Sequence, residues 1–125
     1  MQQPQILVYG VEGRPAEQLQ ELARAQRLWL REVSHLQACR NLLRTARPAV
    51  LVVRLGRDVE RELALVAQVH ELFPETATVV LGDADNPPLA GLAWDLGASY
   101  VLFPPAPAEM LPGIVLQLLA EAPAA

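Results

Sequence analysis

The stretch PAVLVVRLG, residues 48–56, decides the fold that this sequence predicts. Residues 49–53 are all apolar, and Gly56 closes the run. A short run without polar alternation is typical of a strand that is buried on both faces, as in the centre of a parallel sheet. Its last residue before the loop is Arg54. Because ligand crevices of open α/β sheets lie at the carboxyl ends of the strands, a permanently charged guanidinium is expected at such a crevice.

The other predicted strands and helices alternate along the chain. Short apolar runs predict strands at 5–9, 27–33, 76–81 and 100–103. Strand 27–33 alternates charged and apolar residues, which is typical of a sheet edge. Apolar spacing of three and four residues predicts five helices between and after the strands. The first helix begins at Pro15, and the second and third follow the caps Ser34 and Asp58. The fourth is expected over residues 89–96 and the fifth over residues 109–119.

This alternation predicts an α/β fold. Right-handed crossovers between parallel strands place helices on both faces of one doubly wound sheet. Five strands suit the flavodoxin-like order 2-1-3-4-5 of a (βα)5 domain. In that order the third strand is central and the second lies at an edge, as their apolar patterns require.

Composition narrows the classes of function. The 125 residues suit one domain, predicted at 5–120, with 121–125 as a tail or the start of a linker. A net charge of −4 disfavours direct nucleic-acid binding, which needs clustered positive charge. No membrane segment or membrane partner is expected. The lone Cys39 predicts a core position rather than a nucleophile, and the absence of a possible internal disulfide is consistent with the cytoplasm.

Four segments carry a family resemblance. They are ILVYGVE (6–12), ACRNLLRTARPAVLVVRLG (38–56), ELFPETATVVLG (71–82) and LGASYVLFPPAPAEML (96–111). In this order they resemble the receiver domain of bacterial two-component response regulators. The resemblance covers residues 5–120 and implies a role in two-component signalling or a phosphorelay.

The residues that receiver chemistry needs are missing from the matching positions. The resemblance implies two acidic residues for Mg²⁺, an aspartate that takes the phosphoryl group, a Ser or Thr and a lysine. The corresponding residues here are Gly10 and Val11, Arg54, Gly82 and, for the lysine, Phe103, or Pro104 if the preceding loop has not lost a residue. The chain contains no lysine at all. Mg²⁺ needs hard oxygen ligands and phosphoryl transfer needs a carboxylate nucleophile, so we expect neither phosphorylation, nor a cofactor, nor enzymatic activity. The chain is predicted to be a degenerate, or pseudo-, receiver.

Arg54 has two alternative roles. It could pair with a carboxylate from a neighbouring loop, for which Glu12, Asp83 and Asp85 are the candidates. It could instead bind an anion or small ligand, which would make the chain a small-molecule sensor that uses the former phosphorylation crevice. The three acidic residues could also be solvated loop carboxylates or a metal site, and we expect no metal. His35 and His70 lie on different predicted helices without a third ligand, which argues against zinc.

The resemblance also implies a docking surface, formed by the fourth helix, the fifth strand and the fifth helix. The apolar candidates on this surface are Leu89, Leu92, Trp94, Tyr100 and Leu111. The alternative for Trp94 is packing against the sheet. We therefore expect a phosphorylation-independent signalling or regulatory module that acts through protein–protein interaction, with a homodimer through this surface as one form.

Overall fold

The computed structural model describes residues 5–122, which form one parallel sheet of five strands with the order β2-β1-β3-β4-β5. The strands are β1 (Gln5–Tyr9), β2 (Trp29–Val33), β3 (Val50–Arg54), β4 (Ala77–Leu81) and β5 (Tyr100–Leu102). The predicted fold class and strand order are confirmed. In the centre, Val53 of β3 lies opposite Tyr9 of β1 and Val80 of β4.

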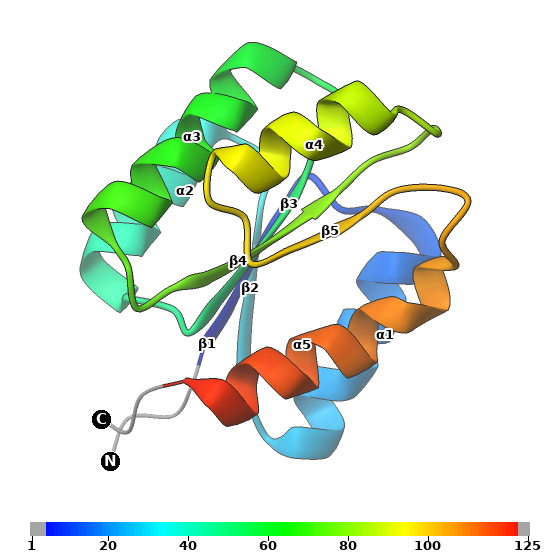
Figure 1. Cartoon of the computed structure of the whole chain (residues 1–125). Coiled ribbons are helices and arrows are strands. Elements are labelled where there is room, and N and C mark those ends of the chain that lie inside the picture. Colours follow the sequence, from blue (N-terminus) through cyan, green and yellow to red (C-terminus); the bar gives the residue numbers. More distant parts are fainter. Residues whose placement is uncertain (1–4, 123–125) are drawn as a thin grey trace.

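Helices cover both faces of the sheet (Figure 1). They are α1 (Gly13–Gln26), α2 (Leu36–Ala46), α3 (Val59–Leu72), α4 (Pro87–Asp95) and α5 (Leu111–Glu121), with a short 3-10 helix, η1 (Ala108–Met110), before α5. Helices α2, α3 and α4 lie on one face, and α1 and α5 lie on the other. None of the helices within residues 5–122 is both long enough and apolar enough to cross a membrane.

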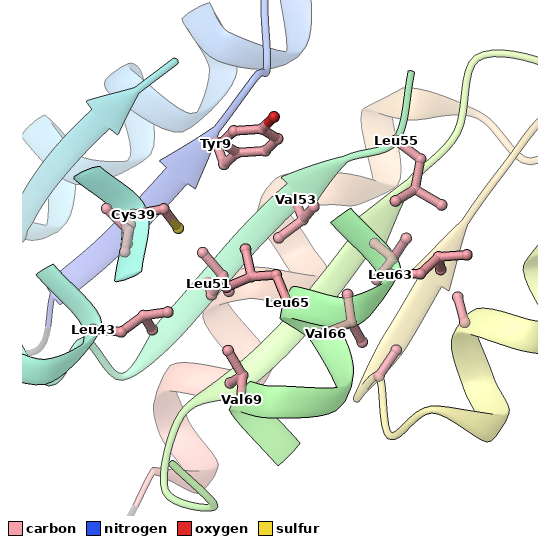
Figure 2. Close-up of a cluster of buried hydrophobic side chains, with 14 of the residues drawn as sticks. Tyr9, Cys39, Leu43, Leu51, Val53, Leu55, Leu63, Leu65, Val66 and Val69 are labelled. Atoms are coloured by element: carbon pink, nitrogen blue, oxygen red, sulfur yellow. The ribbon is translucent and has the colours of Figure 1, made fainter. Parts of the chain in front are cut away.

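Each face of the sheet has its own apolar core. Residues 50–53 of β3 are fully buried and alternate between the two cores, so the central strand is apolar throughout. Figure 2 shows the core under α2 and α3, where Leu51 and Val53 meet Leu65, Val66 and Val69. Cys39 lies in this core with no exposed surface, as predicted, and burial raises the pKa of its thiol to about 12. A thiol that stays protonated in this way is a poor nucleophile.

Local capping explains several element boundaries. Asp58 accepts a hydrogen bond from the Arg61 backbone N–H, which confirms the cap predicted for α3. Ser34 does not cap α2; His35 occupies the N-cap without a side-chain cap bond. Helix α4 begins two residues before the predicted Leu89 because Asn86 accepts a hydrogen bond from the Leu89 backbone N–H.

Other boundaries also differ from the prediction, by one or two residues at α1, β4, β5 and the end of α4. β2 begins at Trp29 rather than at residue 27, because Arg27 adopts a left-handed conformation that closes α1. The last helix is divided into η1 and α5, with a proline in the first turn of α5. α5 continues to Glu121, two residues beyond the predicted Leu119. The tail predicted at 121–125 thus begins inside a helix, and its residues 123–125 lie outside the described range.

Candidate functional site at the carboxyl edge of the sheet

Arg54 ends the central strand and makes a two-point ion pair with Asp83 in the loop after β4. Its Nε donates to Asp83 Oδ1 over 2.9 Å, and its Nη2 donates to Asp83 Oδ2 over 2.7 Å. Its Nη1 also donates to the Gly10 carbonyl oxygen over 3.3 Å. Parallel guanidinium–carboxylate bonds fix the orientation of both side chains. Arg54 therefore joins the loops that follow β1 and β4.

The electrostatics of this pair follow from its hydrogen bonds. Bonding to Arg54 lowers the pKa of Asp83 below its usual value, and bonding to Asp83 raises the pKa of Arg54. The side chains are 30% (Arg54) and 55% (Asp83) exposed. Solvent weakens ion pairs with this much exposure. The pair therefore fixes the orientation of the two side chains but contributes little to the free energy of unfolding.

Arg57 makes a second set of links between the loops. Its Nη2 donates to Glu12 Oε1 and its Nη1 to the Ser34 carbonyl oxygen, both over 3.2 Å. Glu12, one of the three carboxylates considered for Arg54, is thus the partner of Arg57 instead. Arg57 was not among the predicted site residues. Together Arg54 and Arg57 connect the loops after β1, β2, β3 and β4.

Glu62 lies beneath these loops with no exposed surface. The Tyr9 hydroxyl donates to Glu62 Oε2 over 2.8 Å, and the Gly56 backbone N–H donates to Glu62 Oε1 over 3.0 Å. Burial, together with the bond to Glu62, raises the pKa of Tyr9 to about 12. Glu62 was not predicted as a site residue. Its place among the apolar residues of α3 could have indicated a buried carboxyl group. The carboxyl group fixes the start of the loop after β3 against β1.

The ring of Phe103 occupies the space beside Gly82. A Cβ atom built on Gly82 would lie 2.6 Å from Phe103 Cζ and still closer to two other ring atoms. Phe103 is buried, as is Val11 at the other end of the site. Gly10 has a φ of +71°, which favours glycine, and it lies against the Arg54 backbone. The five positions of the receiver resemblance thus meet at one edge of the sheet, filled by a guanidinium and an aromatic ring.

Within residues 5–122, no three His, Cys, Asp or Glu side chains gather closely enough to hold a metal ion. Asp85 is exposed, and none of the salt bridges in the described range includes it. Two surface hollows, of about 410 and 220 Å³, lie elsewhere and are not lined by Gly10, Arg54 or Gly82.

The predicted docking residues lie partly at the surface. Trp94 is 47% exposed, and its ring meets the ring of Tyr100 on the edge strand β5 edge-on at 5.7 Å, so it packs in part against the edge of the sheet and in part faces solvent. Leu92 is also exposed, whereas Leu89 and Tyr100 are half-buried. Leu111 was a wrong choice for a docking surface, because it is fully buried in the core beneath α5. The small residue that anchors α4 to the sheet is Ala93.

We expect the substitution Asp83→Asn to lower the free energy of unfolding by less than about 1 kcal/mol at neutral pH, because the ion pair is exposed. The lowered pKa of Asp83 means that its contribution is present above the unfolded value of 3.8 and is lost as the pH falls through the folded value. Urea unfolding should therefore separate the variant from wild type at neutral pH but not well below pH 3.8. A difference that persists in acid would contradict this account of the pair.

No protein-family model matches the sequence, and no curated protein matches it significantly. Solved structures do match. A CheY-like response regulator receiver domain protein from Methanospirillum hungatei JF-1 has a TM-score of 0.79 at 12% identity, over 96% of both chains. A response regulator from Thermotoga maritima has a TM-score of 0.79 at 19% identity, over 95% of this chain and 99% of that one. An orphan response regulator of H. pylori has a TM-score of 0.77 at 13% identity, over 93% and 96%.

These likenesses cover nearly the whole of each chain, including the five-stranded parallel sheet. At identities below one fifth they concern architecture and not chemistry. The chain therefore has the fold of response regulator receiver domains.

Proposed function

We propose that this chain is a phosphorylation-independent, receiver-like signalling or regulatory module that acts through protein–protein contacts. The observation that carries the proposal is the two-point ion pair between Arg54 and Asp83 at the end of the central strand. A receiver would carry its phosphorylated aspartate at position 54. Here a cation fills the position and is already neutralised by a carboxylate of the same chain.

The surrounding residues support this loss of chemistry. Arginine stays protonated and cannot act as a phosphoryl acceptor. Phe103 stands where a receiver has its lysine, and its ring fills the space that a hydroxyl side chain at position 82 would need. Phosphoryl transfer requires charge neutralisation around the transferred group, and the apolar ring offers none.

The sensor alternative receives no support from the crevice. A ligand site there would need an accessible, unpaired Arg54, whereas its guanidinium has Asp83 and the Gly10 carbonyl oxygen as partners. We therefore do not propose a small-molecule site at this edge.

The proposed contact surface is the exposed side of α4 with β5, which we call the Trp94 face. It consists of Trp94 and Tyr100, whose rings are in contact; Leu92, two positions before Trp94 on the helix, lies on the other flank of α4. Aromatic residues with few neighbouring charges are typical of the centres of protein interfaces. The partner is another protein or a second copy of the chain, in the cytoplasm, where the buried Cys39 thiol remains reduced.

The test combines capture of partners from a native lysate with treatment by acetyl phosphate and Mg²⁺. We expect no gain in the mass of the intact protein and the same captured proteins with and without treatment. Trp94→Ala should abolish capture, or dissociate the dimer in light scattering. Trp29→Ala is the matched control, because Trp29 is 60% exposed on the distant edge strand β2.

Phosphorylation of the chain, or capture that depends on the phosphodonor, would refute phosphorylation independence. Equal losses in the two tryptophan variants would refute the Trp94 face.

A further inference from the structure

A groove between α2 and α3 carries an arrangement that the proposed function does not use. It has a volume of about 220 Å³. Its floor is apolar and consists of Leu43, Leu65 and Val69, all of which are buried. Figure 2 shows these three side chains beside the sheet, one from α2 and two from α3. At the α3 end the groove is bordered by Leu72, which is 63% exposed. Leu72 extends the apolar lining of the groove to the surface, and apolar surface rimmed by polar residues is typical of a contact site.

The rim of the groove is positively charged. Arg40 and Arg44 from α2 line it together with Gln37 and Gln68, and no carboxylate does. Helix α2 contains no acidic residue. Arg40 Nε donates to Gln68 Oε1 over 3.2 Å, and Arg44 Nη2 donates to Asn41 Oδ1 over 3.1 Å. Among residues 5–122, neither arginine forms a salt bridge, although the chain has 14 acidic residues. Both guanidinium groups thus keep donors free for a carboxylate from outside.

We propose that this groove binds an acidic amphipathic peptide segment of another protein. An apolar side chain of the segment would enter the floor beside Leu72, and its Asp or Glu residues would pair with Arg40 and Arg44. The volume suits one side-chain anchor better than a whole small ligand, because sites for drug-sized molecules measure about 300–1,000 Å³. Helices that lay an apolar face into a groove are a common mode of peptide recognition.

Charge and chemistry favour a protein segment over nucleic acid. Two arginines beside an apolar floor do not form the extended, clustered positive surface that a phosphate backbone needs, whereas they suffice for one or two carboxylates beside an apolar side chain. The groove lies away from the Trp94 face, on different helices. The proposal is therefore independent of the proposed function.

The test is a selection of binders from random linear peptides on the immobilised full chain. The affinities of the selected peptides, the winners, are then measured by fluorescence anisotropy. We expect winners that combine Asp or Glu with a large apolar residue. The double variant Arg40→Glu and Arg44→Glu should weaken their binding at least tenfold, and Leu72→Ser should also weaken it. The affinity should fall as salt is raised.

The matched control is Arg24→Glu with Arg27→Glu. Both arginines are exposed at the end of α1, on the opposite face of the sheet, and the pair makes the same change in net charge. The affinity of this control variant for the selected peptides should stay within twofold of the wild-type affinity. Thermal unfolding tests whether each variant is folded. If the variant with two glutamates is unfolded, the neutral double variant Arg40→Gln with Arg44→Gln takes its place.

Three results would overturn the proposal. The first is a selection that yields no binders, or binders without acidic bias. The second is equal binding by wild type and the rim variants, or a nucleic acid that binds the rim more tightly than the winners do. The third is a dimer in light scattering that the rim variants dissociate, because a second copy of the chain would then be the occupant. Since Trp94→Ala leaves the groove unchanged, failure here is distinguishable from failure of the proposed function.

Discussion

Replacing Glu62 with alanine should lower the free energy of unfolding by about 3 kcal/mol. The Glu62 side chain has no exposed surface and accepts hydrogen bonds from the Tyr9 hydroxyl and the Gly56 backbone N–H. Its removal leaves a cavity and a buried hydroxyl without an acceptor. An unsatisfied buried polar group alone costs about 1–3 kcal/mol.

Urea unfolding of a set of variants separates the causes. Glu62→Gln keeps the volume and an oxygen acceptor, so its loss should be about 1 kcal/mol. Tyr9→Phe removes the hydroxyl that needs a partner, and combining it with Glu62→Met should restore much of the stability, because an apolar pair of similar size can replace a buried polar pair. If Glu62→Ala proves as stable as wild type, the carboxyl group does not hold the loop after β3 against β1.

The fold could be predicted because the apolar pattern of each strand and helix is contained in a short stretch of sequence. Residues 50–53 are uninterrupted by polar groups, and a strand of this kind can only lie in the interior of the sheet. Edge strand β2 mixes apolar and charged residues, and none of them is fully buried, since only part of its surface is covered. Boundaries were harder to predict, because they depend on single hydrogen bonds. Asn86, for example, extends α4 by bonding to the Leu89 backbone N–H.

The choice of partners at the site could not be predicted from spacing. Three carboxylates were within plausible reach of Arg54, and loop geometry decides that Asp83 takes Arg54 while Glu12 takes Arg57. The exposed fraction of individual apolar side chains could not be predicted from the sequence either. Trp94 of α4 is half exposed, because Ala93 is the residue of that helix that is buried in the core, whereas Leu111 of α5 is buried in the core on the opposite face of the sheet.

The substitution Gly82→Ser, which would reintroduce a hydroxyl at the position where receivers carry one, should also cost about 3 kcal/mol. A side chain at position 82 would overlap the Phe103 ring, and that ring is buried and has little room to move. Relieving the overlap would require displacement of the ring or of the backbone. Thermal and urea unfolding measure the loss. Gly91→Ser is the matched control, because a Cβ atom there meets nothing within 4 Å and the exposed helical position favours serine over glycine slightly.

A double-mutant cycle with Phe103→Ala decides whether the ring is the cause. Phe103→Ala alone should destabilise the chain, since the ring belongs to the core under α2, α3 and α4. With the ring removed, however, serine at position 82 has space, and the double variant should be more stable than the sum of the single losses predicts by at least about 1.5 kcal/mol. Additive losses would mean that Phe103 does not fill the former hydroxyl position. A favourable coupling would identify the ring as the group that closes this edge of the sheet, and the double variant could then be treated with acetyl phosphate to confirm that space alone does not restore phosphorylation while Arg54 remains.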